Sequence, residues 1–264
     1  MAHFESLTVF FPMWNEQDYI HPAINAAKEI CLDLMSGHVI ADYEILIIND
    51  ASTDRTGFIA DALAQKDPHI RVVHHATNRK LGGSIKSGLA HARGELILYS
   101  DADLPFDFFE LHKAARLLRI YGADIVSCYR HDRTGEGPVR AIYSFVYNWL
   151  IRFMFGIFVR DINFAFKLMR RRILEHIKPV SEGSFIDAEL LIRAHRSGFN
   201  MIQFGVDYFP RSRGISTLSS PATIMIILQE LWQLRKLLKQ IKPLAKEQLK
   251  NIIAAPIEKL RKIG

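Results

Sequence analysis

Two aspartates one residue apart, Asp101 and Asp103, are the clearest candidates for chemistry in this sequence. They follow the run Leu96-Ile97-Leu98, a continuous apolar pattern typical of a strand buried on both faces of a parallel sheet. Side chains at i and i+2 of an extended segment point the same way, so both carboxylates can converge on one Mg²⁺ or Mn²⁺ ion that also holds a diphosphate. The alternative is a solvated turn in which both aspartates cap the next helix, and the triplet alone leaves both open.

The segments before this pair alternate strand patterns with helical patterns. Such alternation favours right-handed βαβ units, and therefore an α/β fold with a mostly parallel central sheet flanked by helices. We expect strands at 7–11 (stopped by Pro12), 43–48, 70–73 and the segment leading to Asp101, with helices opening at Asn15-Glu16 and running to about 35, at 56–65, and from the 78–83 loop to 92.

Polar loops follow three of these four strands, which is what a nucleotide site at the carboxyl ends of a parallel sheet requires. The loop at 78–83 contains Gly82-Gly83 but lacks both the Gly-Lys-Ser/Thr ending of a phosphate loop and the Gly-x-Gly-x-x-Gly spacing of a dinucleotide site. A kinase-like or dehydrogenase function is therefore disfavoured. His74 and His75 are adjacent in a strand and would point to opposite faces, which argues against a shared metal.

The second half of the chain continues the alternation. Residues 140–159 are apolar and aromatic, and they predict either a core helix or a helix at a membrane interface, where aromatic and basic residues mix. Asp187 and Glu189 fall in the first turn of a predicted helix, where carboxylates also stabilise the helix terminus. We expect helices at 108–121, 185–197 and 221–241, strands at 123–128, 164–169 and 200–208, and a basic amphipathic tail at 221–264 after a catalytic domain at 1–220.

Composition narrows the partners. The 264 residues are 49% hydrophobic and 23% charged, which suits a folded globular protein, and the net charge of +6 favours anionic partners such as nucleotide diphosphates or phospholipid surfaces. No nucleic-acid-binding motif is present, so we expect no nucleic-acid partner. Cys31 and Cys128 lie in apolar surroundings and predict buried free thiols in a reducing compartment. We expect neither a signal peptide nor a transmembrane helix.

Taken in order, the motifs resemble family 2 glycosyltransferases with a GT-A fold, a Rossmann-type nucleotide-binding architecture. Within that family the chain looks most like the polyprenyl-phosphate (dolichyl-phosphate) sugar synthases, over about residues 5–220. The matching segments are Phe11 through Glu16, Ile47 through Asp54, Asn78 through Gly83, Asp101 through Leu104, Cys128 through Arg130, Asp161 through Arg170, and Phe209 through Ser216.

The resemblance implies a role for each matching residue. Asp101 and Asp103 would bind Mg²⁺ or Mn²⁺ bridging the diphosphate of a UDP- or GDP-linked sugar, with Ala102 between them, and Asp50 would contact the base or ribose. Asp161 matches a carboxylate proposed as a base in relatives. The remaining substrate contacts would come from Pro12, Asn15, Glu16, Lys80 and Gly82 on the donor side, from Arg130, Arg140 and Ser144 at the acceptor phosphate, and from Arg213 at either phosphate.

Three positions depart from the family pattern. Pro105 stands where relatives often carry a Gln, which removes one possible metal or phosphate contact. Phe164 stands where relatives often have Gly, which would narrow the sugar pocket, so the sugar is not carried over. Asn49 replaces the first Asp of the usual pair after the second strand.

We therefore expect an inverting, metal-dependent glycosyltransferase that acts on polyprenyl phosphate as a peripheral protein at the cytoplasmic membrane face, with a homodimer possible. An acceptor phosphate is already anionic, so Asp161, Asp187 and Glu189 could orient rather than deprotonate. A first alternative is the same fold acting on a hydroxyl acceptor, for which Asp187 or Glu189 would gain importance as the base. A second alternative is a non-catalytic nucleotide-sugar binder, against which the intact Asp101–Asp103 pair counts.

Overall fold

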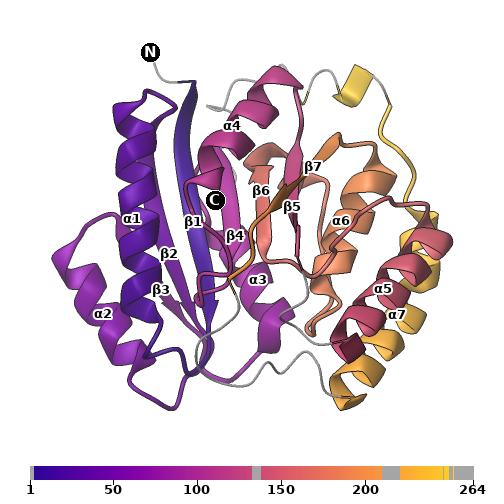
Figure 1. Ribbon diagram of the computed structural model, residues 1–264, viewed down its shortest axis with the longest axis horizontal. Helices are drawn as coiled ribbons and strands as arrows, with labels where there is room; N and C mark the ends of the chain where they lie inside the picture. The colour runs from indigo at the N-terminus through magenta and orange to yellow at the C-terminus, as the bar shows by residue number, and fades with distance from the viewer. Residues whose placement is uncertain (1–2, 133–137, 210–220, 246, 250–251, 253–264) are drawn as a thin grey trace.

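The computed structural model describes residues 3–132, 138–209, 221–245, 247–249 and 252. Seven strands form one sheet in the order β3-β2-β1-β4-β6-β5-β7, and β6 alone among them runs antiparallel to its neighbours (Figure 1). The predicted mostly parallel α/β sheet is therefore confirmed. The strands are β1 (Phe4–Met13), β2 (Ile40–Asn49), β3 (Ile70–His74), β4 (Leu96–Ser100), β5 (Ile125–Arg130), β6 (Phe166–Arg170) and β7 (Met201–Val206).

Helices cover both faces of this sheet. One face packs against α1, α2 and α4, and the other against α3, α5, α6 and α7 (Figure 1). None of the described helices is long and apolar enough to cross a membrane. The helices are α1 (Ile20–Ser36), α2 (Thr56–Lys66), α3 (Lys80–His91), α4 (Glu110–Ile120), α5 (Pro138–Phe155), α6 (Ile186–Ser197) and α7 (Pro221–Gln240), with a 3₁₀ turn η2 at Arg171–Glu175.

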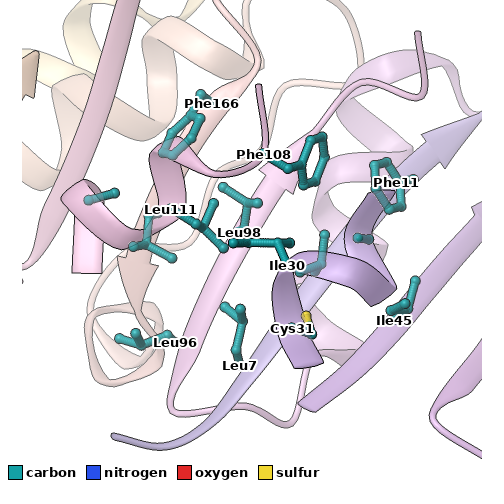
Figure 2. Packing of buried hydrophobic residues seen from close by; sticks show 14 of the residues in the cluster. Leu7, Phe11, Ile30, Cys31, Ile45, Leu96, Leu98, Phe108, Leu111 and Phe166 are labelled. Carbon is teal, nitrogen blue, oxygen red and sulfur yellow. The ribbon is translucent and has the colours of Figure 1, made fainter. Parts of the chain in front are cut away.

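The central strands are buried on both faces, as their continuous apolar patterns predict. Leu96 and Leu98 of β4 point into the layer under α1 and α4, where Figure 2 shows them beside Leu111, Ile30 and Leu7. Ile97 and Tyr99 point the other way, toward α3, α5 and α6. Leu98→Ala should lower the free energy of unfolding by about 2–5 kcal/mol, because the surrounding side chains relax only partly into the cavity that is left. Burial on both faces holds β4 in place in the sheet.

Two predicted boundaries near the first strand are wrong. Pro12 does not stop β1, because the strand continues to Met13 and Pro12 is registered with Ile48 of β2. Pairing of β1 with β4 ends at Phe10, so Pro12 lies where β1 has β2 as its only registered neighbour, and a residue lacking an N–H is tolerated at such an edge. The first helix starts at Ile20 rather than at Asn15-Glu16.

The order of strands has a reversal point between β1 and β4. The chain moves from β1 through β2 to β3 on one side, and then returns to place β4 on the other side of β1. In open α/β sheets ligands bind at the carboxyl ends of the strands beside such a reversal. The loops that follow β1, β2 and β4 meet at this edge of the sheet, so the fold brings together the segments that carry Asn15, Asp50 and Asp101.

Candidate active site

Asp101 and Asp103 lie directly after β4, at the carboxyl edge of the sheet. The hydroxyl of the buried Tyr99 donates to Asp101 Oδ1 over 3.3 Å. Burial, together with the charges of Asp103 and Asp187, raises the pKa of Asp101 to about 7. The aspartates do not cap α4, because that helix begins only at Glu110 and no side chain caps its N-terminal residue. The capping alternative is therefore wrong.

A buried lysine that the sequence analysis did not single out lies opposite this strand end. Lys167 of β6 is registered with Tyr99 and has no exposed surface. Its Nζ donates to Asp187 Oδ1 over 2.5 Å and to the carbonyl of Phe164 over 2.9 Å. Burial raises the pKa of Asp187 and the charge of Lys167 opposes that rise. The only signal for this pair in the sequence is a lysine inside an apolar strand pattern, where an unpaired charge would be costly.

Arg130 and Asp161 form a second buried ion pair. The guanidinium Nε and NH2 reach the two carboxylate oxygens of Asp161 at 2.7 and 2.9 Å, a bidentate arrangement. The guanidinium also lies 5.5 Å from the ring centre of Phe164 and 5.2 Å from that of Tyr208. Asp161, predicted to match a base, and Arg130, predicted at the acceptor phosphate, therefore contact each other. The ring of Phe164 packs against this pair.

Asn15 connects the loops after β1 and β2. Its Oδ1 accepts from the backbone N of Thr53 at 2.8 Å and its Nδ2 donates to the Thr53 hydroxyl at 3.1 Å. Asn15 adopts a positive φ of 56°, which Asn tolerates better than most residues. Next to it, the backbone N of Glu16 donates to the hydroxyl of Thr56. These contacts hold two strand-end loops together, while Pro12 is partly exposed beside them.

Gly82 and Glu189 both fix the loop at 179–183. The backbone N of Gly82 donates to the carbonyl of Glu182 over 3.0 Å, and a Cβ at Gly82 would lie 2.5 Å from backbone atoms of that loop. Glu189 is fully buried and accepts from the backbone N of Val180 and of Ser181. Both residues thus have a demonstrable structural task in forming this loop. Lys80 is exposed at the start of α3, with a φ of 59°.

The remaining predicted residues are less completely placed. Ala102 is buried between the two aspartates, and Ser144 lies partly exposed on α5. Arg140 belongs to α5, but its side chain lies outside the described residues, as does the whole of Arg213. The structure therefore brings Asp101, Asp103, Asp187 and the Arg130–Asp161 pair into one region and leaves the acceptor arginines as predictions.

The donor set at Asp101 and Asp103 fits a hard cation bound together with a substrate. Among the described residues no cluster of three or more His, Cys, Asp or Glu side chains could hold a metal ion by itself. Two carboxylates are nevertheless what Mg²⁺ commonly takes from a protein when substrate phosphates and water complete its shell. Burial, and then the charges of Asp103 and Asp187, raise the pKa of Asp101, and a bound cation would oppose this by favouring the ionised carboxylate.

A surface depression of about 980 Å³ lies elsewhere, among residues at the amino ends of the strands such as Ser6, Asp42 and Gly94. The carboxylate pair and the strand-end loops are at the opposite edge of the sheet. We therefore place the candidate active site at the carboxyl edge, because chemistry requires the reactive groups and not merely a large hollow.

Comparison with known proteins decides the family. Residues 8–178, more than half of the chain, match the model for glycosyl transferase family 2. The chain belongs to glycosyltransferase family 2. It is 30% identical to glycosyltransferase AglD of Haloferax volcanii over 211 residues, which are 78% of the chain. The same residues are 33% of AglD, so the chain spans about one third of the length of that relative. It is 29% identical to the polyprenol monophosphomannose synthase of Mycolicibacterium smegmatis over 224 residues, 80% of either protein.

The expected GT-A fold is also confirmed. Glucosyl-3-phosphoglycerate synthase from Mycobacterium tuberculosis, solved with Mn²⁺, UDP and glucosyl-3-phosphoglycerate, matches this glycosyltransferase with a TM-score of 0.66. The match covers 87% of this chain and 79% of the synthase at 20% sequence identity. The similarity at this level concerns the fold.

Proposed function

We propose that this family 2 glycosyltransferase transfers a sugar, with inversion, from a UDP- or GDP-linked donor to polyprenyl phosphate, using Mg²⁺ or Mn²⁺. The observation that carries the proposal is the carboxylate pair Asp101 and Asp103 at the reversal point of a GT-A sheet. Support for the acceptor comes from the similarity to a polyprenol monophosphomannose synthase over 80% of both chains.

On the donor side, Asp101 and Asp103 would hold the divalent cation. When bound, the cation would neutralise charge that develops on the departing nucleoside diphosphate. Asp50, at the end of β2, would accept a hydrogen bond from the base or ribose. Asn15 would keep the loop after β1 in place, because it already joins that loop to the one after β2.

On the acceptor side, the state of three carboxylates favours a phosphate over a hydroxyl. Asp161 is held by Arg130, Asp187 by Lys167, and Glu189 by two backbone N–H groups. Each of these carboxylates is therefore already engaged in a structural contact, which suits a positioning role. A phosphate needs no deprotonation at neutral pH, so these groups would orient rather than abstract a proton.

A hydroxyl acceptor remains the second candidate function, because one observation favours it. Burial raises the pKa of Asp187, the direction that a general base working near neutral pH requires. In that case Asp187→Asn would abolish transfer. With a phosphate acceptor, the same variant would retain transfer to the extent that its fold is retained.

We also propose that the exposed side of α5 docks on an anionic membrane surface at the cytoplasmic face. This helix buries Ile151 and Phe155 in the core, and its other side exposes a row of large apolar side chains. The exposed set is Ile142, Tyr143, Phe145, Val146, Trp149 and Phe153 on the helix, with Phe158 just after it. Exposed patches of this kind mark interaction surfaces.

The choice of a membrane as the occupant rests on charge. A depression of about 930 Å³ on this side is lined by Phe145, Trp149 and Phe158 together with Arg152 and Arg160. The Arg152 guanidinium lies 3.9 Å from the ring centre of Phe158. Aromatic side chains mixed with arginines suit the interface of an anionic bilayer. The buried free thiols of Cys31 and Cys128 accord with a reducing compartment.

The catalytic proposal is tested by incubating the protein with a panel of nucleotide sugars, polyprenyl phosphate and Mn²⁺, and reading the mass of the lipid product. We expect a polyprenyl-phosphate sugar from at least one UDP- or GDP-linked donor, and no product with Asp101→Ala or Asp103→Ala. Undiminished turnover in either variant would overturn the metal assignment, and product on a glycolipid hydroxyl alone would favour the second candidate.

The membrane proposal is tested by flotation with vesicles containing phosphatidylglycerol. The double variant Trp149→Glu/Phe153→Glu should lose vesicle binding and keep its hydrolysis of the donor in detergent. Phe58→Glu is the matched control, because Phe58 is 69% exposed against 77% for Phe153 but lies on α2, at the other end of the sheet (Figure 1). Unchanged flotation of the double variant, or its conversion from dimer to monomer in sedimentation, would assign this face to something other than the membrane.

A further inference from the structure

Asp50 is held from one side by an arrangement that the sequence did not suggest. It follows β2 at the carboxyl edge of the sheet and is almost fully buried. Its Oδ1 accepts from His75 Nδ1 over 2.6 Å and from the backbone N of Arg79 over 2.8 Å. Among the described residues, both of these donors reach the same carboxylate oxygen. The carboxylate is thus fixed in orientation by two donors on one side.

The His75 ring is itself fixed by Ser87 of α3. Ser87 Oγ lies 2.8 Å from His75 Nε2, and Arg79 NH1 donates to the same hydroxyl oxygen over 3.4 Å. A guanidinium only donates and an ionised carboxylate only accepts. Facing an ionised Asp50, Nδ1 carries the ring proton, and Ser87 Oγ is the partner of Nε2. The result is a connected series of hydrogen bonds that joins Arg79 through Ser87 and His75 to Asp50.

The neighbouring histidine shows that this arrangement is particular to His75. His74 points to the other side of β3, where Nε2 meets Asp61 at 3.0 Å and Nδ1 meets Asn49 at 2.9 Å. The side chain of His74 is 42% exposed, whereas that of His75 is 6% exposed. His75 donates directly to the Asp50 carboxylate, which gives it a route to influence ligand binding through Asp50.

We propose that His75, supported by Ser87, is a positioning residue that orients the Asp50 carboxylate as an acceptor for an N–H or O–H group of the donor's nucleoside. This inference rests on the proposed function, in which Asp50 faces the nucleotide. Because His75 and the Arg79 backbone donate to Oδ1, we assign the ligand contact to the other oxygen. An acceptor whose orientation is set before binding loses less freedom when the ligand arrives.

The test is calorimetric titration of UDP and of GDP, each with Mn²⁺, into the full chain and four variants. His75→Leu removes both ring hydrogen bonds at similar size, and we expect about tenfold weaker binding of the nucleotide that the parent prefers, the effect of losing one hydrogen bond to a charged group. His75→Asn keeps a donor near the Nδ1 position and should bind within about threefold of the parent. His74→Leu is the matched control and should bind like the parent. Ser87→Ala should weaken binding less than His75→Leu does.

A purely structural role predicts a different pattern. It would lower the melting temperatures of His75→Leu and His75→Asn alike and leave nucleotide affinity unchanged in whatever fraction folds. With a donor sugar that the parent turns over, positioning predicts a KM about tenfold higher for His75→Leu at a kcat within about twofold. If His75→Leu does not fold, the comparison of Ser87→Ala with the parent decides, and equal affinity there overturns the inference. Failure of the parent to bind either nucleotide would overturn the proposed function instead.

Discussion

Replacing Asp101 with Asn should stabilise the metal-free protein while abolishing its response to a divalent cation. In the folded protein the pKa of Asp101 is raised from 3.8 to about 7, first by burial and then by the charges of Asp103 and Asp187. Below pH 3.8 the carboxyl group is protonated whether the chain is folded or not. Between about pH 4 and 7 the unfolded chain has lost that proton while the folded protein keeps it, so the free energy of unfolding falls as pH rises.

The size of the effect follows from the two pKa values. At 1.36 kcal/mol per pH unit, a rise from 3.8 to about 7 corresponds to roughly 4 kcal/mol of stability lost above pH 7. Asn cannot ionise and is nearly the same size, so Asp101→Asn should recover about 2–4 kcal/mol at pH 8 and nothing at pH 4. For a domain of this size that is a rise in melting temperature of roughly 5–15 °C.

The assay is a thermal melt at pH 4, 6 and 8, in EDTA and with Mn²⁺. The parent should lose stability toward pH 8 in EDTA and regain it with Mn²⁺, since a cation relieves the same repulsion. Asp101→Asn should melt higher than the parent at pH 8 in EDTA and gain little from Mn²⁺. Asp18→Asn makes the same chemical change at an exposed position and should follow the parent throughout. A parent whose stability in EDTA is flat or rises from pH 4 to 8 would refute the reasoning.

Three further predictions concern the elements around the carboxylate pair. Asp161→Asn should lower the free energy of unfolding by about 3–5 kcal/mol in urea denaturation, because it removes the negative charge that faces the buried Arg130 guanidinium in a bidentate contact. Lys167→Met should lower the free energy of unfolding by a similar amount, because it leaves Asp187 without this cation. The double variant Lys167→Met/Asp187→Leu removes both charges and should recover most of that stability. Equal loss of stability in the single and double variants would contradict this account. Gly82→Ala should lower the melting temperature by several degrees, because the added Cβ would lie 2.5 Å from the backbone of the 181–182 segment. A variant that melts at the temperature of the parent would show that this segment moves to make room.

The elements that sequence patterns predicted best are those whose signal is local. The apolar runs of β2 and β4 and the carboxylates after β4 can be recognised from a few adjacent residues, and the structure places them as expected. The predicted end of the first strand at Pro12 was wrong for an equally local reason, since proline often ends a strand. Here it does not, because β4 stops pairing with β1 before Pro12 is reached. Which strand lies alongside a given residue is a property of the whole fold.

The buried ion pairs could not be predicted, because their partners are far apart in the sequence. Lys167 meets Asp187 only after β6 turns antiparallel between β4 and β5, and Arg130 meets Asp161 across the segment that contains α5. The adjacent histidines show the same limit. Alternation correctly put His74 and His75 on opposite sides, but nothing in the pattern indicated that each would meet its own carboxylate.

The charges in this region give an independent reason to expect a dication at Asp101 and Asp103. Asp187 interacts with Asp101 on one side and with Asp161 on the other, so the groups form one electrostatic unit. Among the described residues this unit includes the carboxylates of Asp101, Asp161 and Asp187 and the cations of Lys167 and Arg130. Asp103 and Asp187 both raise the pKa of Asp101, and a Mg²⁺ or Mn²⁺ ion at the pair would oppose that effect. Without the metal, a proton on Asp101 removes one of these negative charges, and the pKa of about 7 keeps that proton bound up to neutral pH.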